Sequence, residues 1–269
     1  LSFLFFSYGN KRSGKPKILV FSKTVGYRHS AIPDGQKAII KLGAENGFLV
    51  DTTEDAAVFN EDSLKNYSAV VFLNTTDSKD SLLDNYQENA FERYIQAGGG
   101  FVGIHAATDA EYQWGWYGRL VGAYFNGHPE QQEAVLNVVD KTHISTKHLP
   151  SVWKRKDEWY NFKKLNKDVK VLISIDENSY KGGTNGSNHP MAWYHEYDGG
   201  RAFYTELGHT EESYTDPNYL QHILGGIQYA IGENNNLDYT KVHTPKTPEE
   251  ERFTKTVLTS GQFFEPLEM

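Results

Sequence analysis

Cysteine is absent from the 269 residues of the chain. Thiol catalysis, disulfide bonds and cysteine-ligated metal sites are therefore excluded. Basic residues are in the minority, since 27 Lys and Arg stand against 35 Asp and Glu, and the formal net charge is −8. A nucleic-acid partner would need a basic stripe, so we expect no such partner.

The only markedly apolar terminal stretch is short. Residues 1–7 read Leu-Ser-Phe-Leu-Phe-Phe-Ser and give way to the basic segment 11–15. This stretch is far too short to cross a bilayer, so we expect no membrane span. It is typical of the cut end of a secretion signal. We therefore expect residues 1–15 to be the remnant of a leader, and the protein to be periplasmic or otherwise extracytoplasmic.

Aromatic side chains are abundant, at 14% of the chain, with 17 Tyr and 5 Trp. Many lie among polar residues, as in the run 112–117 (Tyr-Gln-Trp-Gly-Trp-Tyr). Rings with polar edges suit hydroxyl-rich ligands such as sugars, although packing in the interior is the commoner use of Trp and Tyr. Both interpretations stay open at this point.

Strand and helix patterns alternate through the first half of the chain. Four apolar stretches have the length of buried strands, namely 17–21, 48–52, 69–73 and 101–104. Amphipathic helix patterns cover 32–46 and 84–97, with a short helical turn at 62–66. Since no hairpin signal separates the four strands, we expect a parallel sheet covered by helices on both faces.

The second half has a different pattern. Residues 133–140 alternate apolar and polar side chains, as in a half-buried strand, and residues 169–175 are again strand-like. Residues 189–196 and 199–205 read as two strands joined by a tight turn at 197–200. A closing helix is expected at 219–231, where the apolar residues share one face.

The strand at 101–104 runs directly into a histidine. The pattern Gly103-Ile104-His105-Ala106-Ala107 has the small residues of a nucleophile elbow, a strained turn between a strand and a helix that exposes one side chain. Histidine replaces the usual Ser or Cys, so an acyl-enzyme mechanism would lack its nucleophile. The alternative is a histidine that packs under a loop or ends a strand, and the stretch alone leaves both open.

Three histidines follow predicted strands. His29 comes after the first strand, His105 after the fourth and His209 after the strand at 199–205. Ligands of open α/β sheets bind at the carboxyl ends of the strands, so the three imidazoles are expected to converge. They could bind a divalent metal such as zinc, or act as acid and base toward a sugar hydroxyl or carbonyl. No HxxxH or HxH spacing supports the metal.

Three further side chains have competing interpretations. Glu158 lies in an acidic and aromatic segment at 157–160, where neighbouring rings could raise its pKa, or it is a surface acid beside a packed Trp. Asp109 could orient His105, although capping the next helix is the commoner role. Arg201 follows a glycine, and we favour a structural role for it over an anionic ligand.

Together these segments resemble a known family. The residues that carry the resemblance are Gly26-Tyr27-Arg28-His29, Gly103-Ile104-His105-Ala106-Ala107, Gly127-His128-Pro129, Glu158-Trp159-Tyr160, Pro190-Met191-Ala192-Trp193, Gly200-Arg201 and Leu207-Gly208-His209. Residues 16–232 are similar to the trehalose-utilisation (ThuA-like) domain of the class I glutamine amidotransferase-like superfamily. The resemblance implies an α/β, flavodoxin-like three-layer sandwich with a mostly parallel central sheet.

By position in that superfamily, His105 stands in place of the amidotransferase nucleophilic cysteine and His209 in place of its catalytic histidine. Without a thiol, glutaminase chemistry is not available. The resemblance implies a carbohydrate-related function, which is either enzymatic action on a disaccharide or oxidised (keto) sugar, as a hydrolase or isomerase, or non-catalytic binding in a larger multidomain protein. The expected catalytic residues are His105, His209 and Glu158. The candidates for binding a small-molecule carbohydrate are Tyr27, His29, Asp109, Trp114, His128, Trp159, Trp193 and Arg201.

The pattern changes after residue 232. Asparagines at 234–236 and the Pro- and Glu-rich segment 244–251 have the composition of a linker. Residues 252–258, with 265–268, resemble the first strand of a sugar-dehydrogenase-type β-propeller. We therefore expect residues 233–269 to be a linker and the start of a further domain that contacts this one.

Overall fold

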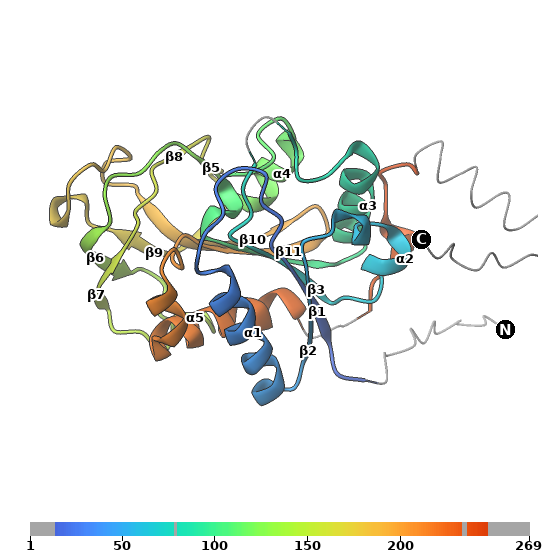
Figure 1. Ribbon diagram of the computed structural model, residues 1–269, viewed down its shortest axis with the longest axis horizontal. Coiled ribbons are helices and arrows are strands. Elements are labelled where there is room, and N and C mark those ends of the chain that lie inside the picture. The colour runs from blue at the N-terminus through green and yellow to red at the C-terminus, as the bar shows by residue number, and fades with distance from the viewer. Residues whose placement is uncertain (1–13, 78–79, 233–235, 247–269) are drawn as a thin grey trace, which may run out of the picture.

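The computed structural model describes residues 14–77, 80–232 and 236–246 (Figure 1). Residues 1–13 of the predicted leader (1–15) and the predicted strand at 252–258 lie outside the described residues. Among the described residues, no helix has both the length and the apolar character needed to cross a bilayer.

Five parallel strands form one half of the central sheet. They are β1 (Lys17–Phe21), β2 (Leu49–Thr53), β3 (Ala69–Leu73), β4 (Gly100–Ile104) and β11 (Gly200–Thr205), in the order β2-β1-β3-β4-β11. β3 and β4 are buried along their whole length. These continuous apolar strands can be buried only if helices cover both faces of the sheet.

Four antiparallel strands extend the sheet beyond β11. They are β10 (Pro190–Tyr197), β9 (Lys170–Ile175), β6 (Gln132–Val138) and β7 (Val152–Asp157), in that spatial order. Two short strands, β5 (Tyr124–Phe125) and β8 (Phe162–Lys163), pair separately. The sequence pattern did not indicate β7 or β8, because β7 is a charged edge strand and β8 has only two residues.

Helices cover both faces of the sheet, which makes the molecule a three-layer, flavodoxin-like sandwich (Figure 1). α1 (Ile32–Asn46) and α5 (Pro217–Ile231) lie on one face, and α3 (Asn85–Gln96) and α4 (Gly115–Val121) on the other. α2 (Glu61–Leu64) packs beside α3. Short 3₁₀ segments are η1 (Ala56–Val58), η2 (His105–Thr108), η3 (Glu177–Ser179), η4 (Glu211–Thr215) and η5 (Tyr239–Lys241). The predicted α/β fold class is confirmed.

Arg201 closes the carboxyl end of α5. Its guanidinium donates to the backbone carbonyls of Tyr229, Ala230 and Ile231 at 3.1–3.2 Å. The last carbonyls of a helix have no partner within the helix, and a cation there also interacts favourably with the negative end of the helix dipole. The described contacts of Arg201 therefore assign it to the structural role that the sequence favoured.

We expect Arg201→Met to lower the free energy of unfolding by about 1–3 kcal/mol, because several buried carbonyls lose a charged donor. Arg201→Lys keeps the positive charge but lacks the planar guanidinium with its several N–H donors, so it should recover only part of the lost stability. Urea unfolding followed by circular dichroism measures both variants. Unchanged stability of Arg201→Met together with weaker sugar binding would point instead to a ligand role.

A buried acid supports the loop that follows η2. Glu111 is 1% exposed, and its Oε1 accepts the N–H of Leu83 at 2.9 Å. Its Oε2 has no hydrogen-bond partner among the described residues. Burial, with smaller contributions from the charges of Glu88 and Asp77, raises the pKa of Glu111 to about 7. The folded chain therefore holds a proton here that an unfolded chain would release near pH 4.5.

This raised pKa makes stability depend on pH. The contribution of protonated Glu111 to stability is fully present below the pKa of the unfolded chain, and it is lost as the pH rises through the folded pKa of about 7. Glu111→Gln keeps the Oε1 acceptor without the charge, so it should be more stable than the parent at pH 8, by about 1–3 kcal/mol, and differ little at pH 5. Urea unfolding at both pH values tests this, with the exposed Glu130→Gln as control. An equal difference at both pH values would contradict the assignment.

Candidate functional site

His105 occupies a strained turn at the end of β4. Its φ of 48° lies in the left-handed region, which side chains other than glycine rarely adopt. The hydroxyl of Tyr204 donates to the carbonyl of His105 at 2.7 Å, and that of Tyr117 to the carbonyl of Ala107 at 2.7 Å. A Cβ at Gly103 would lie 2.9 Å from the ring of Tyr204. The turn has the geometry of the predicted elbow.

Two contacts fix the imidazole of His105, which is completely buried. Its Nδ1 lies 2.6 Å from the backbone oxygen of Glu206, and its ring centroid 4.4 Å from that of Tyr160. A carbonyl oxygen can only accept, so in the neutral ring Nδ1 carries the hydrogen. Nε2 then presents its lone pair to the centre of the site.

Three more side chains meet His105 there. One donor atom from each of His29, His105, Glu158 and His209 lies within 4.8 Å of the others, and we call these four residues the histidine–glutamate cluster. The three histidines follow β1, β4 and β11, whose carboxyl ends share one edge of the sheet. Glu158 follows β7 in the antiparallel half. The structure thus brings together the three histidines and the carboxylate that the sequence singled out.

Distances within the cluster are those of direct polar contact. Nδ1 of His209 lies 3.1 Å from Nε2 of His105 and 3.1 Å from Oε2 of Glu158. Nε2 of His105 lies 3.5 Å from the same carboxylate oxygen. The ring centroid of His29 lies 4.9 Å from that of His105 and 5.1 Å from that of His209, with both ring pairs nearly perpendicular.

Burial and charge have opposite effects on the pKa of Glu158 and of His209. Burial opposes ionisation of Glu158, but hydrogen bonds and charge interactions with His105 and His209 lower its pKa below the usual range. Burial likewise favours neutral His209, yet the interactions with Glu158 raise its pKa. His29 is 3% exposed, and burial, followed by the charges of His105 and His209, lowers its pKa to about 2. His29 is therefore neutral, whereas His209 and Glu158 favour an ion pair.

Two buried acids behind the cluster were missed by the sequence analysis. Asp157 accepts the N–H of Glu158 at 3.1 Å and that of Gly208 at 3.3 Å, so one carboxylate ties the segments that carry Glu158 and His209. Glu206 is wholly buried, which raises its pKa well above the ordinary value, and its Oε1 accepts the N–H of Tyr160 at 3.1 Å. In the sequence, each acid directly precedes a segment that carries the family resemblance. Asp157 precedes the segment 158–160, and Glu206 precedes the segment 207–209.

The rim of the cluster holds three other predicted residues. His128 places Nδ1 3.2 Å from Oε1 of Glu158, and its side chain is 41% exposed. Tyr27 is 66% exposed, with its ring centroid 4.9 Å from that of His29. The carboxylate of Asp109 accepts the hydroxyl of Tyr112, and no described contact joins it to the ring of His105. Asp109 does not cap α4 either, since the residue before that helix is Trp114.

The tryptophans are engaged in packing. Trp159 and Trp193 are 0% exposed, and their indole N–H groups donate to the carbonyls of Gln132 and Val121, each at 2.8 Å. Trp114 is 8% exposed and donates to Glu92 at 3.0 Å. These contacts leave little ring surface for a sugar, so we assign the three to the core instead of to ligand binding.

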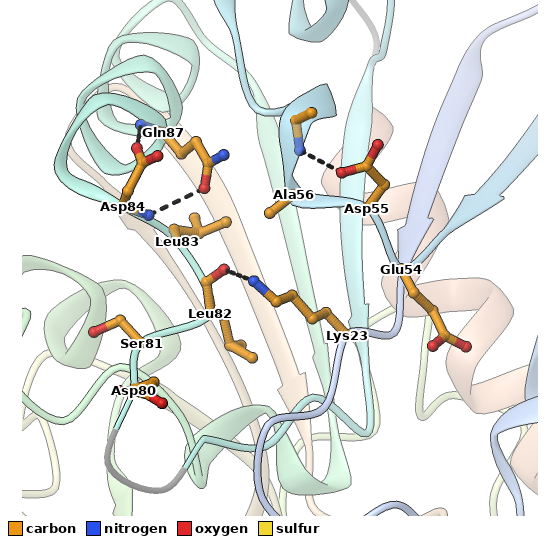
Figure 2. Close-up of a pocket in the computed structure, with 11 residues that line it drawn as sticks. Lys23, Glu54, Asp55, Ala56, Asp80, Ser81, Leu82, Leu83, Asp84 and Gln87 are labelled. Carbon is orange, nitrogen blue, oxygen red and sulfur yellow. Dashed lines mark hydrogen bonds between the residues drawn. The ribbon is translucent and has the colours of Figure 1, made fainter. Parts of the chain in front are cut away.

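A separate pocket lies between the segments that follow β1 and β2 and the segment that leads into α3 (Figure 2). Several of its polar groups are engaged within the chain. Lys23 donates to the carbonyl of Leu82 at 2.7 Å, and Asp84 and Gln87 form the capping box of α3. No member of the cluster lines it. Glu54, on its rim, binds both terminal nitrogens of Arg28 and so anchors the loop that carries His29.

The strain at position 105 gives a stability prediction. His105→Gly and His105→Ala both remove the imidazole, but only glycine adopts the left-handed backbone without a steric cost. We expect the Gly variant to unfold at a higher urea concentration than the Ala variant, by roughly 1 kcal/mol in unfolding free energy. Equal midpoints would show that the backbone relaxes when the side chain is removed.

Comparison with known proteins places these features in a family. A putative ThuA-like protein from Bacteroides uniformis aligns with 87% of this chain and 99% of its own, at 23% identity and a TM-score of 0.70. A second, from Parabacteroides merdae, aligns with 86% of this chain and 98% of its own, at 22% identity and a TM-score of 0.63. A β-galactosidase from Bacillus circulans aligns over 80% of this chain and 31% of its own, at 12% identity and a TM-score of 0.52. None of the curated proteins compared matches the chain. The family model for trehalose utilisation matches residues 17–230, and the chain therefore belongs to the trehalose utilisation (ThuA) family.

Proposed function

We propose that the chain is an enzyme that acts on a small carbohydrate, with the histidine–glutamate cluster as its reaction centre. The observation that carries the proposal is the convergence of three imidazoles and one carboxylate, from four distant segments, within 4.8 Å. Family membership supports the substrate class, because trehalose utilisation is a carbohydrate-related function.

The cluster is costly to maintain in a folded chain. His105 is held at a positive φ, and ionisable groups are buried beside one another. Such features lower stability and persist mainly where function requires them. A structural role would be served equally well by apolar side chains of similar volume. This cost favours a reaction centre over a packing cluster.

The chemistry that fits the cluster is proton transfer at a sugar hydroxyl or carbonyl. Glu158 and His209 lie 3.1 Å apart, and their interaction lowers the pKa of the carboxyl and raises that of the imidazole, so protonated His209 is the proton donor of the pair. His105 presents a fixed ring nitrogen to the same point. A hydrolase or an isomerase that acts on a disaccharide or keto sugar would use such groups, whereas an amidotransferase would need a thiol.

The rim offers contacts for a hydroxyl-rich ligand. Tyr27 presents an exposed ring beside His29, and His128 presents a half-exposed imidazole beside Glu158. An exposed aromatic face can pack against the C–H face of a sugar while polar groups bind its hydroxyls. We therefore assign Tyr27 and His128 to substrate binding.

The alternative is a non-catalytic carbohydrate-binding domain. Such a domain would rely on exposed aromatic platforms. Tyr27 offers one, but Trp114, Trp159 and Trp193 are used in packing. The two functions differ in one measurable respect, since only the enzyme releases a product.

The test is turnover of a panel of disaccharides and their keto derivatives by the parent and by His105→Gly, Glu158→Gln and His209→Gln. We expect the three variants to lose product formation by at least about 100-fold, because each removes a proton-transfer or positioning group. Melting temperatures should stay near that of the parent. His243→Ala serves as control, since that imidazole is largely exposed and lies outside the cluster.

Sugar binding without any product, in the parent as well as in the variants, would favour the non-catalytic alternative. Turnover that survives all three substitutions would show that the reaction centre lies elsewhere in the molecule.

A further inference from the structure

We infer that the histidine–glutamate cluster is a binding site for one divalent transition-metal ion, held by His29, His105, His209 and Glu158. The inference rests on the proposed function in placing the reaction at this cluster, but the arrangement of the donor atoms carries it. Zinc is the ion that fits the donors best.

Three of the four donor atoms already form a triangle of the right size. Nε2 of His105, Nδ1 of His209 and Oε2 of Glu158 are separated by 3.1, 3.1 and 3.5 Å. Zinc bonds to nitrogen and oxygen of about 2.0–2.1 Å place two ligands of a tetrahedral ion about 3.3–3.4 Å apart. One ion can therefore contact all three atoms with little movement of the side chains.

Hydrogen bonding alone does not satisfy this triangle. Since Nδ1 of His105 donates to the carbonyl of Glu206, Nε2 of the neutral ring is an acceptor. The carboxylate of Glu158 is also an acceptor, so a single hydrogen on Nδ1 of His209 faces two acceptors at 3.1 Å. A cation at the centre of the triangle would interact favourably with every lone pair at once.

His29 supplies the fourth donor and an independent observation. The residue is 3% exposed, and its Nδ1 is buried without a hydrogen-bond partner among the residues that the structure describes. An unpaired polar atom in the interior costs free energy, and most native structures avoid it. One ring nitrogen of His29 lies within 4.8 Å of each of the other three donors, so a shared ion would account for the position of this ring.

The surroundings have the features of a metal site. Histidine ligands usually donate their second ring N–H to a carbonyl or carboxylate, which fixes the tautomer and the orientation of the ring. His105 makes such a bond to the carbonyl of Glu206. Nδ1 of His128 lies 3.2 Å from the second oxygen of Glu158 and forms its hydrogen bond with the carbonyl of Pro129 at 3.0 Å. His105 is thus oriented by a group outside the cluster.

The donor set selects the class of ion. Three imidazoles and one carboxylate suit zinc and neighbouring transition metals, whereas magnesium and calcium prefer ligands that are all oxygen. His209 and Glu158 retain 15% and 9% of their side-chain exposure, so the centre reaches solvent on their side. A fifth ligand, water or a sugar oxygen, could enter there, as in catalytic zinc sites.

Metal binding is tested on the full chain without reference to turnover. The protein is stripped with a chelator and titrated with Zn²⁺ by calorimetry and by competition with a chromophoric chelator. We expect one tight site per chain, and a loss of affinity of more than about 100-fold in His29→Ala and in His209→Ala, which exceeds the usual effect of replacing a residue that only supports a metal ligand. His243→Ala removes an exposed histidine outside the cluster and should bind as the parent does.

Cobalt gives a second readout. The visible absorption of Co²⁺ reports its coordination number and symmetry, so the loaded parent should show intense bands of a four- or five-coordinate ion. His209→Gln keeps most of the side-chain volume and guards against a folding defect, which circular dichroism of the stripped proteins would reveal. Glu158→Gln should weaken binding and alter the spectrum.

Three outcomes would overturn the metal site: no binding near one ion per chain, affinity unchanged in both histidine variants, or equal loss in His243→Ala. Failure of the proposed function is separately visible. If the stripped protein turns over substrate fully and only the cluster variants lose turnover, the protein is an enzyme that works without a metal. Tight metal binding with no sugar product would support the metal site and contradict the proposed carbohydrate reaction.

Discussion

The hydrogen bond from the imidazole of His105 to the carbonyl of Glu206 is the interaction on which the site depends. It joins the ends of two neighbouring parallel strands, β4 and β11, at 2.6 Å, and it fixes which ring nitrogen faces the cluster. The positive φ of His105 aims the ring at that carbonyl, and the hydroxyl of Tyr204 holds the turn in place. Backbone strain, ring orientation and the lone pair on Nε2 are thus parts of one arrangement.

Around this bond, buried hydrogen bonds hold the charged groups of the cluster in place. Glu158 and His209 reach the centre on loops, but the carboxylate of Asp157 binds backbone N–H groups in both segments and limits their motion. Arg155 in turn donates to Asp157 at 3.0 Å. Satisfied hydrogen bonds of this kind allow charged groups to be buried, because each replaces the contacts with water that the group has lost.

The sequence predicted the parallel half of the fold well, since continuous apolar strands and amphipathic helices have clear periodicities. The strand at 17–21 and the helix at 32–46 have the predicted bounds. The convergence of His29, His105 and His209 followed from the rule that parallel strands end at one edge. By contrast, the sequence did not indicate β7, because this edge strand ends in a run of charged residues at 154–157 without apolar alternation. The packing roles of Trp159 and Trp193 depend on carbonyls of Gln132 and Val121 that only the tertiary structure brings near. No local pattern encodes such contacts.

The division of the central sheet into a parallel and an antiparallel half has a consequence for how the molecule is built. Three donors of the cluster belong to the parallel half, but the fourth, Glu158, comes from the loop after the outermost antiparallel strand. Pairings between segments distant in the chain form late, because closing long loops has an entropic cost. His105 and His209 stand 104 residues apart in the chain and meet only when β4 and β11 pair, so the reactive groups come together only when the molecule is nearly native.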